Sequence, residues 1–84
     1  MPEVVIYSSP VCPYCIKAKQ LLSSKGVDYK EIDISRDPAL AAEVREKTGR
    51  QTVPQIFIGD YHVGGCDDLY ALDAEGKLDE LLQG

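Results

Sequence analysis

The sequence carries little that points to a membrane, to secretion or to nucleic acid. It has no apolar run of about 18 residues, which a membrane-spanning helix would need, and no basic segment followed by an apolar one, which a secretory leader would show. Its 9 Lys and Arg residues form no cluster, and 14 Asp and Glu residues give a net charge of -5, which argues against nucleic acid as a partner. We therefore expect a cytoplasmic protein that binds neither membranes nor nucleic acid.

Repeats, linkers and low-complexity segments are also absent. With 84 residues, the chain is expected to form one domain over residues 1–84 with a small core, and we expect it to be a monomer. Its 3 cysteines, an odd number in a short chain without a leader, argue against a secreted disulfide framework. They favour thiol chemistry in a reducing compartment.

Two of these cysteines, Cys12 and Cys15, enclose Pro13 and Tyr14 and lie between a β-branched run and a helical pattern. The first turn of a helix places residues i and i+3 on one face, as a disulfide between them would require. A proline at the first helical position loses no hydrogen bond, so Pro13 predicts a helix with Cys12 at its N-cap. Free amides and the helix dipole favour a thiolate there. Cys12 is therefore the predicted nucleophile, and the less exposed Cys15 the resolving thiol.

A pair of cysteines at this spacing is also half of many structural zinc sites. The remaining ligands could only be His62 and Cys66, which would complete a Cys3His set. A strand directly before the pair and a helix directly after it favour the other interpretation, a redox motif on a βαβ unit. We therefore expect no metal, and we assign His62 a structural or surface role.

Hydrophobic periodicity predicts an α/β fold. The expected strands cover residues 3–7, 27–34, 55–58 and 61–63, and the expected helices begin at Pro13, Pro38 and Cys66 and after Gly76. A helix separates the first two strands, which must then be parallel, whereas Gly59-Asp60 joins the last two in an antiparallel hairpin. The first strand should be central and buried on both faces. We expect a four-stranded mixed sheet in the order β-α-β-α-β-β-α, with a short C-terminal helix.

This pattern of elements resembles the thioredoxin superfamily and, more narrowly, the dithiol glutaredoxins. Three separated motifs carry the resemblance: Cys12-Pro13-Tyr14-Cys15, Thr52-Val53-Pro54 and Gly64-Gly65-Cys66-Asp67-Asp68. The absence of Trp before the first cysteine separates the chain from thioredoxin itself. The resemblance implies a thioredoxin-like fold and a glutathione-dependent thiol-disulfide oxidoreductase. Its substrates would be protein-glutathione mixed disulfides, reduced through Cys12 alone, and protein disulfides, reduced through Cys12 and Cys15. Glutathione would be a co-substrate, with no other cofactor.

The resemblance also implies a glutathione site. The proline of the second motif is cis in the family, which implies that Pro54 is cis and that Val53 displays its backbone N–H and C=O beside the active cysteine, where an extended peptide can pair with them. The amides after Gly65 suit a carboxylate, and the side chains of Asp67 and Asp68 suit an ammonium group. In a plainer interpretation, Asp67 only caps the helix and Asp68 only favours its dipole. The implied binding residues are Tyr14, Thr52, Val53, Pro54, Gly65, Cys66, Asp67 and Asp68.

The side chains around this site are expected to differ in exposure. Cys66 should contribute its backbone while its sulfur packs as a small apolar group, and Tyr14 should be exposed beside the tripeptide. The other tyrosines should pack in the interior; they are Tyr7, Tyr29, Tyr61 and Tyr70.

One position departs from the family pattern. Many glutaredoxins have a lysine three residues before the first active cysteine, where its charge favours the thiolate and can meet the glycyl carboxylate of glutathione, whereas this chain has Ser9. The remaining candidates for that carboxylate are Lys17, Arg50 and the amide of Gln51.

Two other functions are compatible with parts of the sequence. A relative that takes electrons from thioredoxin reductase would keep the two cysteines and need no γ-glutamyl site. An iron-sulfur binding module would hold a cluster between two subunits through Cys12 and glutathione. Pro13 and Cys15 argue against the cluster, because relatives that hold one usually lack the proline or the second cysteine.

Overall fold

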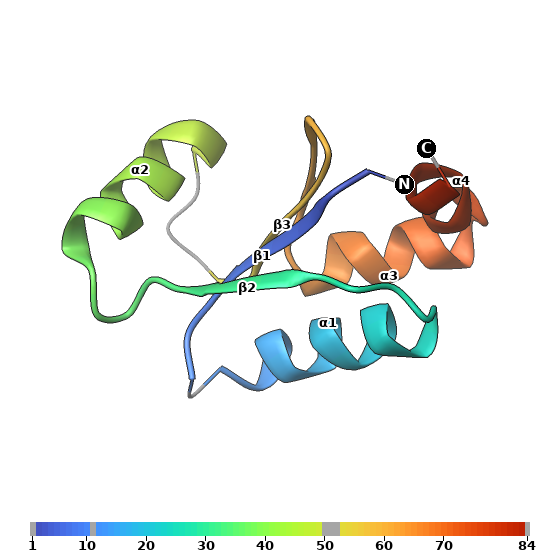
Figure 1. Ribbon diagram of the computed structural model, residues 1–84, viewed down its shortest axis with the longest axis horizontal. Helices are drawn as coiled ribbons and strands as arrows, with labels where there is room; N and C mark the ends of the chain where they lie inside the picture. The colour runs from blue at the N-terminus through green and yellow to red at the C-terminus, as the bar shows by residue number, and fades with distance from the viewer. Residues whose placement is uncertain (1, 11, 50–52, 84) are drawn as a thin grey trace.

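The computed structural model describes residues 2–10, 12–49 and 53–83. Its elements follow the predicted order (Figure 1): β1 (Val4–Ser8), α1 (Pro13–Ser24), β2 (Lys30–Asp33), α2 (Pro38–Thr48), β3 (Gln55–Ile58), β4 (Tyr61–Gly64), α3 (Cys66–Ala74) and α4 (Lys77–Gln83). Over these residues, no helix has the length and apolar character needed to cross a membrane.

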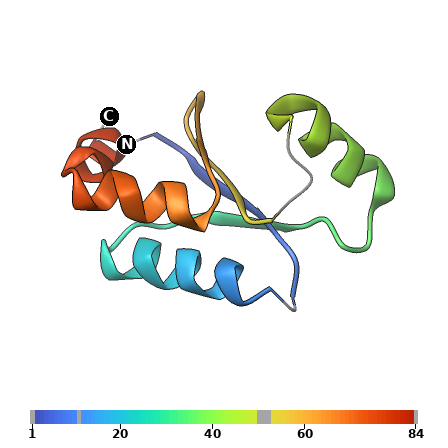
Figure 2. The ribbon, with the colours of Figure 1, turned by 180° about the vertical axis from the view of Figure 1, so that it is seen from behind.

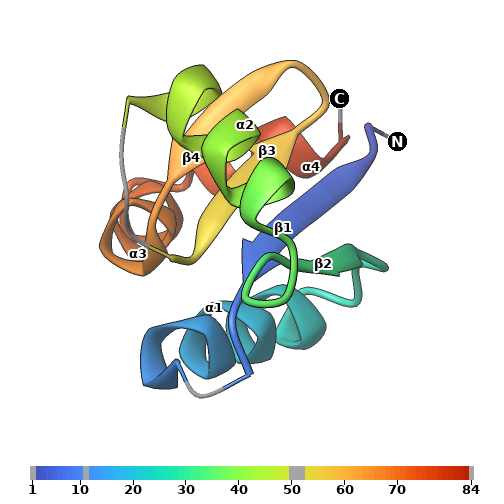
Figure 3. The same ribbon diagram turned by 90° about the vertical axis from the view of Figure 1, so that its left-hand side faces the viewer.

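The four strands form one mixed sheet in the spatial order β2-β1-β3-β4 (Figure 3). β1 is parallel to β2 and antiparallel to β3, and β3 and β4 form an antiparallel hairpin. β1 is therefore central, as predicted. β2 is shorter than the predicted strand over residues 27–34, because its pairing with β1 runs only from Val5↔Lys30 to Ser8↔Asp33.

The core lies between the sheet and α1, α3 and α4. Figure 2 shows α1 and α3 side by side, and side chains from both helices meet the sheet in one cluster. The largest fully buried apolar side chains are Ile6, Leu22, Ile56, Leu69 and Leu78. Burying a side chain of this size stabilises the fold by about 1.5–3 kcal/mol. This packing holds the beginnings of α1 and α3 next to each other.

The opposite face of the sheet is only partly covered, so the prediction that β1 is buried on both faces is wrong. Val4, Ile6 and Ser8 are buried, but the alternate residues Val5 and Tyr7 are only half-buried. The reason is the position of α2, which lies apart from α1 and α3 (Figure 1). Val44 is its one fully buried side chain among residues 38–48.

α2 begins at Pro38, as predicted, and both of its ends are specified locally. The carboxylate of Asp37 accepts hydrogen bonds from the amides of Ala39 and Leu40 at 3.1 and 3.2 Å, and Pro38 occupies the first turn. Gly49 ends the helix with a φ of 69°, which a residue with a side chain rarely adopts.

Two of the tyrosines that were expected to pack in the interior lie on the surface. Tyr61 and Tyr70 are exposed, although the hydroxyl of Tyr70 donates to the carbonyl of Lys17 at 3.2 Å. Tyr7 does pack, edge-on against Phe57. Periodicity assigns a residue to a face of an element and does not show how far neighbouring elements extend over that face.

Candidate active site

The beginning of α1 places Cys12 at the N-cap, as predicted. Its backbone is extended, with φ −101° and ψ 111°, and Pro13 follows in the first turn. The sulfur of Cys12 accepts a hydrogen bond from the amide of Cys15 at 3.3 Å. The thiolate is the form of a cysteine that acts as a nucleophile.

The two sulfurs differ in access. Cys12 is partly exposed, whereas Cys15 is 0% exposed, and both are free thiols. Burial, followed by the hydrogen bond to Cys12, raises the pKa of Cys15 to about 12, while the amide of Ser9 and the charge of Lys19 act in the opposite direction. An external disulfide can therefore reach Cys12 first, and Cys15 can act only after it.

The segment before β3 brings a second backbone element to Cys12. The peptide bond between Val53 and Pro54 is cis, as the family resemblance implied. The thiol of Cys12 donates to the carbonyl oxygen of Val53 at 3.6 Å. A backbone group that could pair with an extended peptide is therefore in contact with the nucleophile.

The beginning of α3 forms the other side of the site. Gly65 is its N-cap residue, and Gly64 before it has a φ of 111°, a conformation that favours glycine. The carboxylate of Asp68 accepts a hydrogen bond from the amide of Gly65 at 2.9 Å. Asp68, and not Asp67, is thus the side chain that caps the helix, which corrects the plainer interpretation of these two residues.

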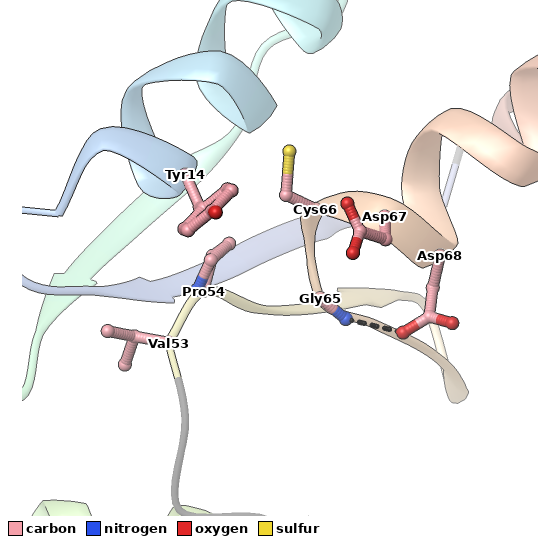
Figure 4. A pocket seen from close by; sticks show the side chains of 7 residues that line it. All are labelled: Tyr14, Val53, Pro54, Gly65, Cys66, Asp67 and Asp68. Carbon is pink, nitrogen blue, oxygen red and sulfur yellow. Dashed lines mark hydrogen bonds between the residues drawn. The ribbon is translucent and has the colours of Figure 1, made fainter.

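One pocket of about 250 Å³ joins these segments (Figure 4). Every predicted glutathione-binding residue within the described part of the chain lines it: Tyr14, Val53, Pro54, Gly65, Cys66, Asp67 and Asp68. Thr52 lies outside the described residues, as do Arg50 and Gln51. Tyr14 is 57% exposed, as predicted. In Figure 4 the carboxylate of Asp68 is turned towards the amide of Gly65, while that of Asp67 points in another direction.

The fold and this site match those of known proteins. The glutaredoxin family model matches residues 4–63. The chain belongs to the glutaredoxin family. It is 62% identical over 82 residues to a glutaredoxin of Pseudomonas aeruginosa, with 98% of each chain covered. It is 57% identical over 83 residues to glutaredoxin 3 of Escherichia coli, covering 99% of this chain and 100% of that one.

A solved glutaredoxin structure shares the fold. The crystal structure of a buckwheat glutaredoxin–glutathione complex aligns with a TM-score of 0.91 at 34% identity, covering 98% of this chain and 77% of the other. The thioredoxin-like fold expected for the chain is therefore confirmed. Together with the high identity to glutaredoxins, the nearby thiols of Cys12 and Cys15 establish a thiol-disulfide oxidoreductase.

His62 and the third cysteine of this glutaredoxin, Cys66, were the other candidates for a zinc site. Within residues 2–10, 12–49 and 53–83, no three His, Cys, Asp or Glu side chains are grouped closely enough to hold a metal ion. His62 instead lies 2.7 Å from the side-chain oxygen of Gln55 and stacks on Phe57. Cys66 is only 6% exposed. Burial, and then the charge of Asp67, raise the pKa of Cys66, so its sulfur is a poor nucleophile near neutral pH.

Sequence reasoning missed one charged cluster next to α1. Lys19 and Glu31 form an ion pair at 2.8 Å, and the buried hydroxyl of Ser8 donates to the same carboxylate oxygen at 2.7 Å. These two hydrogen bonds lower the pKa of Glu31, and the bond with Glu31 raises the pKa of Lys19. No local pattern could have revealed it, because Lys19 and Glu31 lie 12 positions apart in different elements.

Proposed function

We propose that the thiolate of Cys12 attacks protein-glutathione mixed disulfides and that glutathione supplies the electrons. The position of Cys12 carries the proposal. It lies at the N-cap of α1, in contact with the carbonyl of Val53, which borders the pocket. This arrangement combines an accessible sulfur, a backbone amide that donates to it and a surface that can bind the peptide next to the scissile disulfide.

The pocket supplies complementary groups for glutathione. The amides at the beginning of α3 suit the γ-glutamyl carboxylate, and Asp67, which is exposed, suits the ammonium group. Val53 can pair with the peptide backbone as a further strand would, and the ring of Tyr14 covers one side. The existence of a glutathione complex of buckwheat glutaredoxin supports this assignment.

Lys17 is poorly placed for the other end of glutathione. It borders a groove together with Tyr14, Cys66 and Asp67, which is the end of the site proposed for the γ-glutamyl group. The glycyl carboxylate would lie further along the peptide, so we do not assign it to Lys17.

In the monothiol route, Cys12 attacks the glutathione sulfur of the mixed disulfide. A bond forms between Cys12 and glutathione, the bond to the protein sulfur breaks, and the protein leaves as a thiolate that takes up a proton. A second glutathione thiolate then attacks the glutathione sulfur held on Cys12. Oxidised glutathione leaves, and Cys12 is regenerated as a thiolate.

In the dithiol route, Cys12 first forms a mixed disulfide with one sulfur of a protein disulfide. Cys15 then attacks Cys12, so that the protein leaves fully reduced and Cys12 and Cys15 become a disulfide. Two glutathione molecules reduce that disulfide. Glutaredoxin potentials of about −200 to −230 mV lie near the glutathione poise measured by extraction, so the cycle can run in either direction.

The proposed cycle uses glutathione as a co-substrate and requires no metal or organic cofactor. A reduced glutathione pool of this kind is typical of the cytoplasm, where we place the protein as a monomer. Its macromolecular partners would be glutathionylated proteins and proteins with exposed disulfides.

A coupled assay tests this function. A glutathione mixed disulfide of a small peptide is supplied with glutathione, glutathione reductase and NADPH, and NADPH oxidation is followed by absorbance. We expect turnover that depends on both the protein and glutathione. Turnover with thioredoxin reductase and NADPH in the absence of glutathione, and none in the first assay, would assign the electrons to the other donor.

A further inference from the structure

Cys15 faces a specific chemical difficulty in the dithiol route. It must attack Cys12 as a thiolate, yet it is 0% exposed, and its burial raises its pKa to about 12. The monothiol route does not use Cys15 and has no such requirement. A group that favours the charged form of Cys15 would therefore affect one route and leave the other unchanged.

The ion pair of Lys19 and Glu31 involves the residue one turn of α1 beyond Cys15. Lys19 follows Cys15 by one turn of α1, so the two residues lie on one side of the helix. Glu31 fixes the ammonium group from β2, opposite Ile6 in the register of the two strands. Ser8, which is 1% exposed, fixes Glu31 in turn. The chain Ser8–Glu31–Lys19 thus ties the end of β1 to the side of α1 that carries Cys15.

The charge of Lys19 also acts on the thiol of Cys15. In the described part of the chain, the groups that act on the pKa of Cys15 are the Cys12 thiol, the amide of Ser9 and Lys19. Glu31, Tyr29 and Cys15 all act on Lys19. Lys19 is thus the one positive side chain among these groups. Its side chain is 26% exposed and that of Glu31 is 40% exposed, so water screens part of the effect.

We propose that Lys19, held by Glu31, is a positioning residue that makes Cys15 available as a thiolate for the second step of the dithiol route. This role rests on the proposed function, because only a dithiol cycle uses Cys15. In that step the bond between the sulfurs of Cys15 and Cys12 forms, and the bond between Cys12 and the substrate sulfur breaks. The electron pair leaves on the substrate sulfur. The proton lost by Cys15 passes to solvent, and the departing thiolate takes one up in return.

An aromatic disulfide whose released thiolate absorbs visible light separates the two steps without glutathione. Attack by Cys12 releases the first chromophore, and attack by Cys15 on the resulting mixed disulfide releases the second. Cys15→Ser identifies the second phase, because that variant lacks it. The variants compared are Lys19→Gln, Lys19→Arg and, as a control for the lost charge, Lys30→Gln on the exposed side of β2.

We expect Lys19→Gln to slow the second phase and to leave the first within twofold. A rise of one unit in the pKa of Cys15 lowers its thiolate fraction about tenfold and raises the nucleophilicity of the thiolate about threefold. After screening by water, the rate of the second phase should therefore fall roughly two- to fivefold. The pH profile of the second phase should move to higher pH. Lys19→Arg keeps the positive charge and the ion pair with Glu31, so it should retain the wild-type rate and pH profile of the second phase.

The possible results are distinct. An unchanged second phase in Lys19→Gln would overturn the role of Lys19, as would equal slowing by Lys30→Gln or failure of Lys19→Arg to restore the rate. A slower second phase without a shift of the pH profile would indicate a purely structural effect and would also reject it. If the proposed function were wrong, the wild type would fail the glutathione assay while these two phases could still be measured.

Discussion

The sulfur of Cys12 and the carbonyl oxygen of Val53 lie 3.6 Å apart, although 41 positions separate the two residues in the chain. The contact joins the beginning of α1 to the segment that leads into β3. A peptide that pairs with the backbone of Val53 would therefore place its own sulfur near Cys12 without further rearrangement. Holding reacting atoms at about 3–3.5 Å is a large part of catalysis by orientation.

The two active cysteines should separate the two routes. We expect Cys12→Ser to abolish reduction of both glutathione mixed disulfides and protein disulfides, because no other described thiol is both accessible and at a helix N-cap. Cys15→Ser should retain the first activity and lose the second. The coupled assay with each substrate measures both. Equal losses in both variants on the mixed disulfide would contradict this division of roles.

Asp67 and Asp68 should have different effects when replaced. Asp67→Asn should raise the KM for glutathione roughly two- to fivefold, the value of an exposed ion pair, with no change in thermal stability. Asp68→Ala should also destabilise the fold by about 0.5–2 kcal/mol, because it removes the side chain that caps α3. Steady-state kinetics and thermal unfolding of the same samples distinguish these effects. Identical stability of the two variants would contradict a capping role for Asp68.

Cys15 should make the reduced protein sensitive to alkaline pH. Its pKa is raised from 9.0 to about 12 in the folded state, so an unfolded chain loses this proton at lower pH than the folded one. The stabilising contribution is complete below about pH 9 and is lost progressively as pH rises towards 12. Urea unfolding of the reduced protein should show stability that falls as pH rises above about 9. Cys15→Ala should flatten that dependence, and equal slopes for the two proteins would exclude this cause.

Ser9→Lys should accelerate the reaction of Cys12 with glutathione mixed disulfides. The carbonyl of Ser9 accepts a hydrogen bond from the amide of Cys12 at 3.3 Å, so the backbones of the two residues are in contact, and we expect the charge of a lysine here to act on the sulfur. The positive charge would increase the fraction of Cys12 present as thiolate, but a less basic thiolate is also a weaker nucleophile. Because the two effects partly cancel, we expect a roughly two- to fivefold increase in rate at low salt. The gain should shrink at high salt. A rate that does not change, or a change that does not depend on salt, would show that the N-terminus of α1 and its amides already activate Cys12 without a cation at position 9.

Much of the fold could be predicted because its boundaries are marked locally. Asp37-Pro38 and Gly49 specify α2, and Gly59 marks the turn between β3 and β4. The active-site helix was predictable for the same reason, since Pro13 fixes its first turn. The contact between Cys12 and Val53 followed only from the family resemblance, because no local pattern relates residues so far apart.

The features that sequence reasoning missed depend on tertiary geometry. The ion pair of Lys19 and Glu31 requires the register of β1 with β2 and the placement of α1 against both, neither of which periodicity specifies. The exposure of Tyr61 and Tyr70 depends in the same way on where neighbouring elements end. The capping role of Asp68 was missed because two adjacent aspartates offer equivalent local signals.

The separate position of α2 has a consequence for the opening motions of the native protein. Four buried side chains tie α1 to the core, whereas Val44 alone does so for α2 within residues 38–48. Elements with few buried contacts open at a lower free energy than the whole molecule unfolds. In hydrogen-deuterium exchange, the amides of α2 should therefore exchange earlier than those of α1. Cys15 lies within α1 and Cys12 is its N-cap residue, so the geometry of both thiols should survive an opening of α2.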